Sequence, residues 1–220
     1  MAEKEDLVEF IKGNIANDLA KGVVCTDVSS DKAVGSVANY IVNGKIENVT
    51  NYAKISAGTN GTYCGGIAGR IQKGSVKGCI NYGTVSSSAV HAKSFVMGGI
   101  AGYCETDSTY LIECTNYAAL TNSHNGSNAF IGGLVGRVNV KSLVKNCTNE
   151  GTVTTSGTMS GNVYLGGIMG SNTGGAATIE NCTNAATADI TNSCSAAQIF
   201  LGGILGNASV ASVLNICTNS

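Results

Sequence analysis

The hydrophobic and polar positions of this chain repeat with a period of about 34 residues. In each period a short apolar or aromatic run, such as Phe130-Ile131, stands directly before a pair of glycines. Another short run, such as Gly151-Thr152-Val153-Thr154, alternates polar and apolar residues, which is typical of a half-buried strand. Helical spacing fits neither run, and Gly, Thr, Ser and Asn are too frequent for helices. We therefore expect three short strands per repeat, separated by turns.

Two short motifs mark each repeat. The first is Gly-Gly, an aliphatic residue, a variable residue and a further Gly, and its five copies begin 33, 34, 34 and 36 residues apart. The second is Cys-x-Asn, which has an aliphatic residue three positions before the cysteine. The five glycine motifs begin at Gly65, Gly98, Gly132, Gly166 and Gly202. A fixed period of this length is typical of stacked repeat architectures.

A sixth, weaker copy precedes these five. The segment 35–41 aligns with 65–71 without a gap, and Ile46 and Asn51 then fall in register with the later repeats. The repeats thus begin near residues 33, 63, 96, 130, 164 and 200. We predict an all-β fold, a right-handed parallel β-helix of about six coils, in which residues 23–220 form one β-solenoid domain.

The first 22 residues follow a different pattern. Leu7, Phe10, Ile11, Ile15 and Leu19 recur mainly at helical steps among charged residues, and no continuous apolar core of a signal peptide is present. We predict an amphipathic helix over residues 1–22 that caps the first coil, because an uncovered coil end is an exposed strand edge. The chain stops within a repeat, so we expect the C-terminal coil to be uncapped.

Stacking should place equivalent residues in columns about 4.8 Å apart, the spacing of strands in a sheet. The asparagine of each repeat forms a column whose side-chain amides can hydrogen-bond between layers. Its members are Asn51, Asn81, Asn116, Asn149, Asn184 and Asn219. The cysteine forms a neighbouring column of small buried hydrophobic residues. Its members are Cys79, Cys114, Cys147, Cys182 and Cys217.

Composition and charge agree with a stacked β architecture. The chain has 30 glycines, no proline and 12% charged residues, as expected for tight turns and uninterrupted strand ladders. The net charge of −1 disfavours nucleic acid as a partner, because phosphate binding requires a concentrated basic face. No run of 18 apolar residues occurs, so we expect no membrane span. The nine cysteines are widely spaced, and we expect them to be mostly reduced and buried.

One candidate binding surface consists of tyrosines. Tyr52, Tyr82 and Tyr117 each follow a column asparagine directly, so three phenol rings should stack near one edge. Such a row could be a platform for sugar rings or for a protein partner, because tyrosine combines rigid area with a polar group. The alternative is a ladder that only stabilises the stack, and this is the commoner role of such rows.

Candidate catalytic and metal-binding groups are few. His91, His124, Met159 and Cys194 share one corner loop in successive repeats, and such ligands suit copper. Coincidence in a variable loop explains them better, and we predict no metal and no other cofactor. The chain shows no nucleophile elbow and no catalytic triad, and its acidic residues are scattered. We therefore expect no enzymatic activity.

The repeated Gly-[Ile/Leu]-x-Gly core, followed by the Cys-x-Asn strand, resembles the GLUG-motif repeat of bacterial cell-surface and secreted proteins. The resemblance covers about residues 33–220. It implies a surface-displayed solenoid, extracellular or on the cell surface, that serves as a stalk or an adhesive module without activity of its own. Some immunoglobulin A-cleaving peptidases carry such repeats, but no His-Glu-x-x-His motif is present here.

Three functions fit these observations. We favour a non-catalytic structural or adhesive module of a bacterial surface protein, which presents a binding face to a glycan or to a host or neighbouring protein. The second is head-to-tail self-association through the C-terminal coil by strand addition. The third is a carbohydrate-active β-helix enzyme. We rank the functions in this order because nearly every recurring position of the repeat contributes to stacking, and few positions carry reactive groups.

Overall fold

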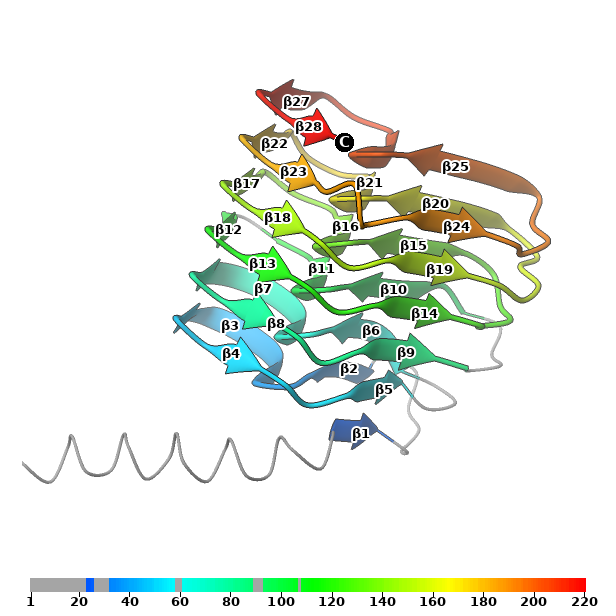
Figure 1. Cartoon of the computed structure of the whole chain (residues 1–220), viewed down its shortest axis with the longest axis horizontal. Coiled ribbons are helices and arrows are strands. Elements are labelled where there is room, and N and C mark those ends of the chain that lie inside the picture. The colour runs from blue at the N-terminus through cyan, green and yellow to red at the C-terminus, as the bar shows by residue number, and fades with distance from the viewer. Residues whose placement is uncertain (1–22, 26–31, 58–60, 89–92, 107) are drawn as a thin grey trace, which may run out of the picture.

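The chain forms a parallel β-solenoid (Figure 1). The computed structural model describes residues 23–25, 32–57, 61–88, 93–106 and 108–220, and all regular structure within these ranges is β-strand. The predicted all-β parallel solenoid is confirmed, whereas the hand of its coiling stays a prediction. The predicted helix over residues 1–22 lies outside the described residues.

Four parallel sheets form the walls of the solenoid. Sheet A contains β1 (Val23–Cys25), β5 (Ile55–Ala57), β9 (Val85–Ser87), β14 (Leu120–Asn122), β19 (Val153–Thr155) and β24 (Ile190–Asn192). Sheet B contains β2 (Lys32–Gly35), β6 (Gly61–Gly65), β10 (Phe95–Gly98), β15 (Ala129–Gly132), β20 (Asn162–Gly166) and β25 (Gln198–Gly202). Sheet D contains β4 (Thr50–Asn51), β8 (Ile80–Asn81), β13 (Thr115–Asn116), β18 (Thr148–Asn149), β23 (Thr183–Asn184) and β28 (Thr218–Asn219).

Sheet C lies between sheets B and D along the chain and bends at a corner. In the first two turns one long strand passes through this corner, as β3 (Ala38–Glu47) and β7 (Ala68–Lys77). The later turns have longer corners: two residues separate Ile71 from Gly74, whereas four separate their partners Cys104 and Thr109. The strand is therefore divided, into β11 (Ala101–Cys104) and β12 (Thr109–Ile112), β16 (Val135–Val138) and β17 (Ser142–Lys145), β21 (Met169–Asn172) and β22 (Ala177–Glu180), and β26 (Leu205–Ala208) and β27 (Ser212–Asn215).

One turn of the solenoid passes through sheets B, C, D and A in that order. Five turns are complete, from β2–β5 to β20–β24, and a sixth contains β25–β28. The repeats pair in register, so that Gly98 lies between Gly65 and Gly132. The expectation of three strands per repeat was wrong, because the two-residue strand of sheet D and the divided strand of sheet C were not recognised as separate elements.

The interior contains two apolar clusters. One packs inside sheet C and includes Ile71, Val76 and Leu111. The other packs between sheets A and B and includes Val85 and Phe95. Between sheet D and the glycine turn that links sheets B and C, the column asparagines approach the glycines across the interior, as Asn81 approaches Gly66.

A residue in the left-handed conformation leads from sheet C to sheet D in every turn. Its φ lies between 49° and 61°, and the residues are Asn48, Gly78, Glu113, Asn146, Asn181 and Ile216. Glycine and asparagine adopt this conformation readily, but a β-branched residue does not. Asn181 Nδ2 also donates to Asn146 Oδ1 at 2.9 Å, which links two successive turns. The corner is therefore strained at Ile216.

We expect Ile216→Asn to stabilise the protein. A left-handed conformation costs an ordinary L-residue about 1–2 kcal/mol, and asparagine avoids much of this cost. The reverse change, Asn146→Ile, should destabilise the protein by a similar amount and also removes the amide contact with Asn181. Thermal unfolding followed by circular dichroism measures both changes. Unchanged midpoints for the two variants would contradict the left-handed corner.

Candidate functional site

The column asparagines form one continuous ladder inside the solenoid. In each pair the side-chain Nδ2 donates to Oδ1 of the asparagine in the next turn, with lengths between 2.7 and 3.0 Å. The donors are Asn51, Asn81, Asn116, Asn149 and Asn184, and the last acceptor is Asn219. All except Asn219 are buried. The ladder therefore joins all six turns through side chains.

The amides of Asn51, Asn116, Asn149 and Asn184 also donate to a carbonyl of their own turn. Asn116 Nδ2 donates to the Ala118 carbonyl at 2.9 Å, and Asn116 Oδ1 accepts from the Ala118 N–H at 3.3 Å. Asn51 makes the same two contacts with Ala53, at 3.0 and 2.9 Å. A buried amide is tolerated only when its donors and acceptor are paired, and this arrangement pairs them.

The ladder explains the second glycine of the Gly-Gly motif. A Cβ atom on Gly133 would overlap the side chain of Asn149 and the carbonyl oxygen of Gly167. The same conflict recurs in other turns, for example between Gly99 and Asn116. From Asn81 onward a Cβ atom does not fit opposite the amide, so the two motifs of the repeat are the two sides of one contact across the interior. In the first turn Ser36 stands at the second-glycine position.

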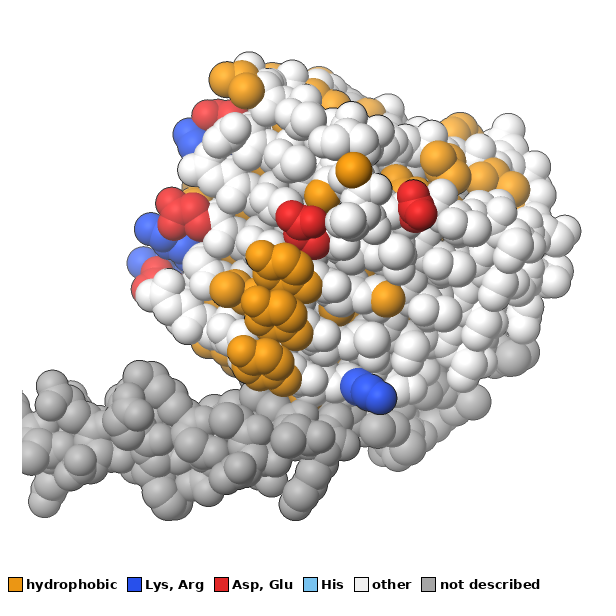
Figure 2. Space-filling view, in the orientation of Figure 1, with side chains coloured by type: hydrophobic (Ala, Val, Ile, Leu, Met, Phe, Trp, Pro, Cys, Tyr) orange, Lys and Arg blue, Asp and Glu red, His pale blue; other side chains and the backbone are white. Residues whose placement is uncertain are grey.

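Tyr52, Tyr82 and Tyr117 form an exposed stack, called here the tyrosine ladder. Successive ring centroids are 5.2 and 4.8 Å apart, and the ring planes lie within 5° of each other. The residues are 68%, 45% and 47% exposed, so the stack is open to a partner. Figure 2 shows the resulting apolar patch on the face formed by β4, β8 and β13. The register places Glu150 above Tyr117, where the patch ends.

The stacked rings cover one another, so the patch presents mainly ring edges and hydroxyl groups. A sugar ring packs best against an open aromatic face, and such a face remains only at the two ends of the stack. The tyrosine ladder therefore favours a partner that forms hydrogen bonds with a row of phenol hydroxyls.

The sequence comparisons identify the repeat. Residues 127–154 match the family model described as the GLUG motif. They contain β15 to β18 and most of β19, which is one turn of the solenoid. One turn of the solenoid is therefore a GLUG motif. The predicted resemblance is thus confirmed. Neither the curated proteins nor the solved structures gave a match.

A second aromatic cluster of the GLUG solenoid was missed in the sequence. It lies on the outer faces of sheets B and C, where Tyr63 and Tyr103 stack at 4.9 Å and Phe130 and Tyr164 at 4.8 Å. Arg137 lies over two of these rings, Phe130 and Tyr103. Burial raises the pKa of Tyr103. The signal was an aromatic residue two positions before most Gly-Gly pairs, which we interpreted only as strand propensity.

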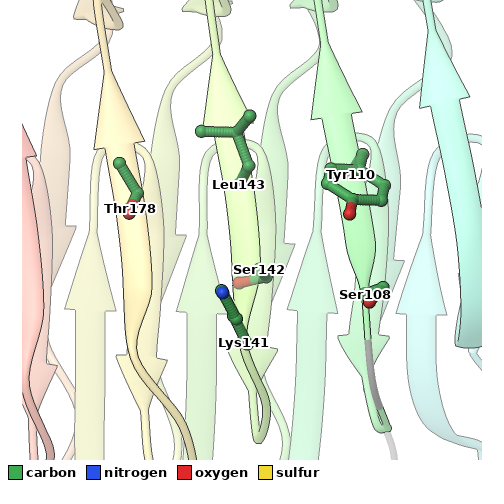
Figure 3. A pocket seen from close by; sticks show the side chains of 6 residues that line it. All are labelled: Ser108, Tyr110, Lys141, Ser142, Leu143 and Thr178. Atoms are coloured by element: carbon green, nitrogen blue, oxygen red, sulfur yellow. The ribbon is translucent and has the colours of Figure 1, made fainter.

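A shallow cavity of about 280 Å³ lies nearby, over β12, β17 and β22 (Figure 3). It is lined by Ser108, Tyr110, Lys141, Ser142, Leu143 and Thr178. No motif predicted it, because its lining residues come from three successive turns. Its polar groups are the hydroxyls of two serines, a tyrosine and a threonine and the ammonium group of Lys141, set in a surface that is largely apolar and includes Leu143.

The cysteine column lies inside the wall of the solenoid. Its members are free thiols, and all except Cys217 are buried, as predicted. Cys114 Sγ lies 3.3 Å from the Ile112 carbonyl oxygen, to which the thiol donates a weak hydrogen bond within the wall. The contact with Cys114, together with burial, raises the pKa of Cys79, and burial raises the pKa of Cys104 to about 12. The thiols of Cys79 and of Cys104, a buried cysteine outside the column, therefore stay protonated near neutral pH and are poor nucleophiles. The contacts with Cys147 and Cys79 lower the pKa of the Cys114 thiol to about 4.

The corner loop does not assemble its soft ligands. His124 is buried, stacks on Phe95 at 5.3 Å and places Nε2 3.3 Å from the Lys93 carbonyl oxygen. Met159 belongs to the apolar cluster of sheets A and B, and His91 lies outside the described residues. In the described ranges, no group of three His, Cys, Asp or Glu residues could hold a metal ion. The same ranges contain no helix long and apolar enough to cross a membrane.

We expect Asn149→Ala to destabilise the GLUG solenoid by about 2–4 kcal/mol. The substitution leaves the Asn116 amide without its acceptor and Asn184 Oδ1 without its donor, and each unpaired buried group costs about 1–3 kcal/mol. Asn219→Ala is the matched control, because Asn219 is exposed at the end of the ladder. Urea unfolding measures both variants. Equal losses of stability at the two positions would show that the ladder contributes no more than a surface amide.

Proposed function

We propose that this GLUG solenoid is a non-catalytic structural and adhesive module of a bacterial surface protein, located extracellularly or on the cell surface. The tyrosine ladder is its binding face, and the partner is a glycan or a host or neighbouring protein. The observation that carries the proposal is the parallel, exposed stack of Tyr52, Tyr82 and Tyr117 on a rigid wall.

The rigidity of the wall supports a binding role. Each tyrosine directly follows a ladder asparagine, whose hydrogen bonds hold the backbone of that turn in register. The hydroxyls are therefore held in a row with a spacing close to that of the rings. Pre-organised groups lose little conformational freedom on binding, which favours affinity. Tyrosine is also enriched at interfaces, because it adds a polar group to a large apolar area.

The exposure of the ladder distinguishes it from the other aromatic cluster. Tyr103 and Phe130 are 7% and 6% exposed, so that cluster packs against its own wall. The tyrosine ladder leaves about half or more of each residue open to solvent. An exposed contiguous aromatic patch is the kind of surface that binds a partner. The resemblance to surface-displayed repeats is the ground for proposing an extracellular location.

We expect the triple variant Tyr52→Phe/Tyr82→Phe/Tyr117→Phe to lose at least tenfold in affinity for a partner identified on glycan and protein arrays. The change removes three hydroxyls and keeps the ring stack, and each neutral hydrogen bond contributes about 0.5–1.5 kcal/mol. Tyr40→Phe, at an exposed tyrosine outside the ladder, should bind normally. Biolayer interferometry measures the affinities.

Unchanged binding by the triple Phe variant and by the corresponding triple Ala variant would rule out the ladder as the binding face. Release of product from any of a panel of polysaccharides, including polyuronates, would instead favour the carbohydrate-active enzyme and contradict the non-catalytic proposal.

Head-to-tail association of the 220-residue chain is a second candidate function. Leu201 and Leu214 are 53% and 48% exposed on the last turn, whereas their equivalents one turn earlier, Leu165 and Ile179, are fully buried. A cavity of about 230 Å³ lies beside them, between sheets A and D. At the last turn, the edge strands β24, β25, β27 and β28 could pair with the first-turn strands of a second copy.

For this second candidate we expect the mass of the chain to rise with concentration in light scattering after size exclusion. Leu214→Lys should return it to a monomer, because a charge would then be buried in the contact. Tyr110→Lys, at an exposed residue of the third turn, is the control and should leave association intact. A constant monomer mass at all concentrations would refute the association.

A further inference from the structure

Two arginines occupy equivalent positions on sheet C, and only one has a carboxylate partner. Arg70 and Arg137 both pair in register with Tyr103, from the turns on either side of it. Arg70 forms a bidentate ion pair with Glu105, with Nε 2.9 Å from Oε2 and Nη2 in contact with Oε1. Arg137 instead donates from Nε to Thr173 Oγ1 at 2.9 Å.

Glu105 and Thr173 stand at the same position of the repeat. Glu105 follows Cys104, and Thr173 follows Asn172; both of these residues pair in register with Val138. The carboxylate that neutralises the first arginine is therefore replaced by a hydroxyl beside the second. Within the described ranges, no carboxylate lies within ion-pair distance of Arg137.

The guanidinium of Arg137 is held in place by rings. Its Cζ lies 4.8 Å from the centroid of Phe130 and 5.5 Å from that of Tyr103. Stacking uses the faces of the guanidinium and leaves the N–H groups in its plane for hydrogen bonds. Thr173 takes Nε, so the two Nη groups are available. A stacked, half-buried arginine whose Nη groups have no carboxylate partner is suited to binding a planar carboxylate.

A second cation lies on the same turn. Lys141 is four residues after Arg137, across the corner between β16 and β17, and no described carboxylate pairs with it. It lines the cavity of Figure 3 together with the hydroxyls of Ser108, Tyr110 and Thr178. The fourth turn thus carries, four residues apart along the chain, an arginine without a carboxylate partner and a lysine that lines a cavity with hydroxyl groups.

We propose that this corner of the fourth turn binds an acidic oligosaccharide. The two Nη groups of Arg137 bind the carboxylate of one uronic acid unit, and the cavity beside Lys141 holds an adjacent unit through its hydroxyls. Glu105 is the precedent for a carboxylate rather than a phosphate. The row of hydroxyl groups favours a sugar over an acidic peptide, whose backbone would offer few matching hydroxyls. The site is separate from the tyrosine ladder, since β16 lies behind β18 and β19 in the view of Figure 1.

An exchange between the two arginine sites tests this proposal. Thr173→Glu supplies Arg137 with the carboxylate that Arg70 already has, and should abolish binding of a galacturonate trimer while raising the unfolding temperature. Thr173→Gln, of similar size and without charge, should still bind. Glu105→Thr should uncover Arg70 without adding a second site of the same affinity, because Gly74 stands four residues after Arg70, where Lys141 follows Arg137. Arg137→Gln should lose at least tenfold in affinity, and Lys141→Gln should lose several-fold. Isothermal titration calorimetry measures affinity and stoichiometry.

Wild-type affinity in both Thr173→Glu and Arg137→Gln would overturn the proposal, as would absence of binding to the wild-type protein. Preference for a polyglutamate peptide over the trimer would overturn the assignment to a sugar, and equal binding of a neutral galactose trimer would overturn the role of the carboxylate. The triple Phe variant of the tyrosine ladder should bind the trimer normally, so that failure of this site and failure of the proposed binding face remain distinguishable.

Discussion

The buried amide ladder is the constraint on which the rest of the structure depends. Each asparagine must meet the next one a single layer away, and from Asn81 onward each has a glycine opposite, because a Cβ atom there would overlap the amide. A turn that slipped by one residue would bury unpaired amides, at about 1–3 kcal/mol for each group, and would turn core side chains toward solvent. Register is thus specified in every turn by polar contacts as well as by apolar packing.

Surface columns follow from this interior register. Because the ladder fixes the backbone directly before each tyrosine, the rings of Tyr52, Tyr82 and Tyr117 have to stack, and their parallel planes follow from the fold. The same rule places Arg70, Tyr103 and Arg137 in one column on sheet C. Because the interior register is fixed, the surface residues of a solenoid can differ from one turn to another. The equivalent positions of Glu105 and Thr173 illustrate such a difference.

The features that sequence reasoning missed are contacts between residues of different strands and different turns. The aromatic residues before the Gly-Gly pairs were visible as strand formers, but their contact with arginines of sheet C depends on the sharp turn between the sheets. The cavity beside Lys141 likewise depends on corners of different length in successive turns. Neither feature has a periodic signature. By contrast, the burial of Cys79 and Cys114 could be predicted from the recurrence of cysteine at one position of the repeat.

The sequence by itself determined the period, the parallel stacking and the membership of each column. These follow from aligning repeats, because stacked strands put like positions together whatever the shape of the coil. The tertiary structure decided the number of walls, the left-handed corner before each cysteine, and the pairing of the second glycine with the asparagine. Those features depend on how sharply the chain bends between strands, and they join residues on opposite walls, so no local pattern specifies them.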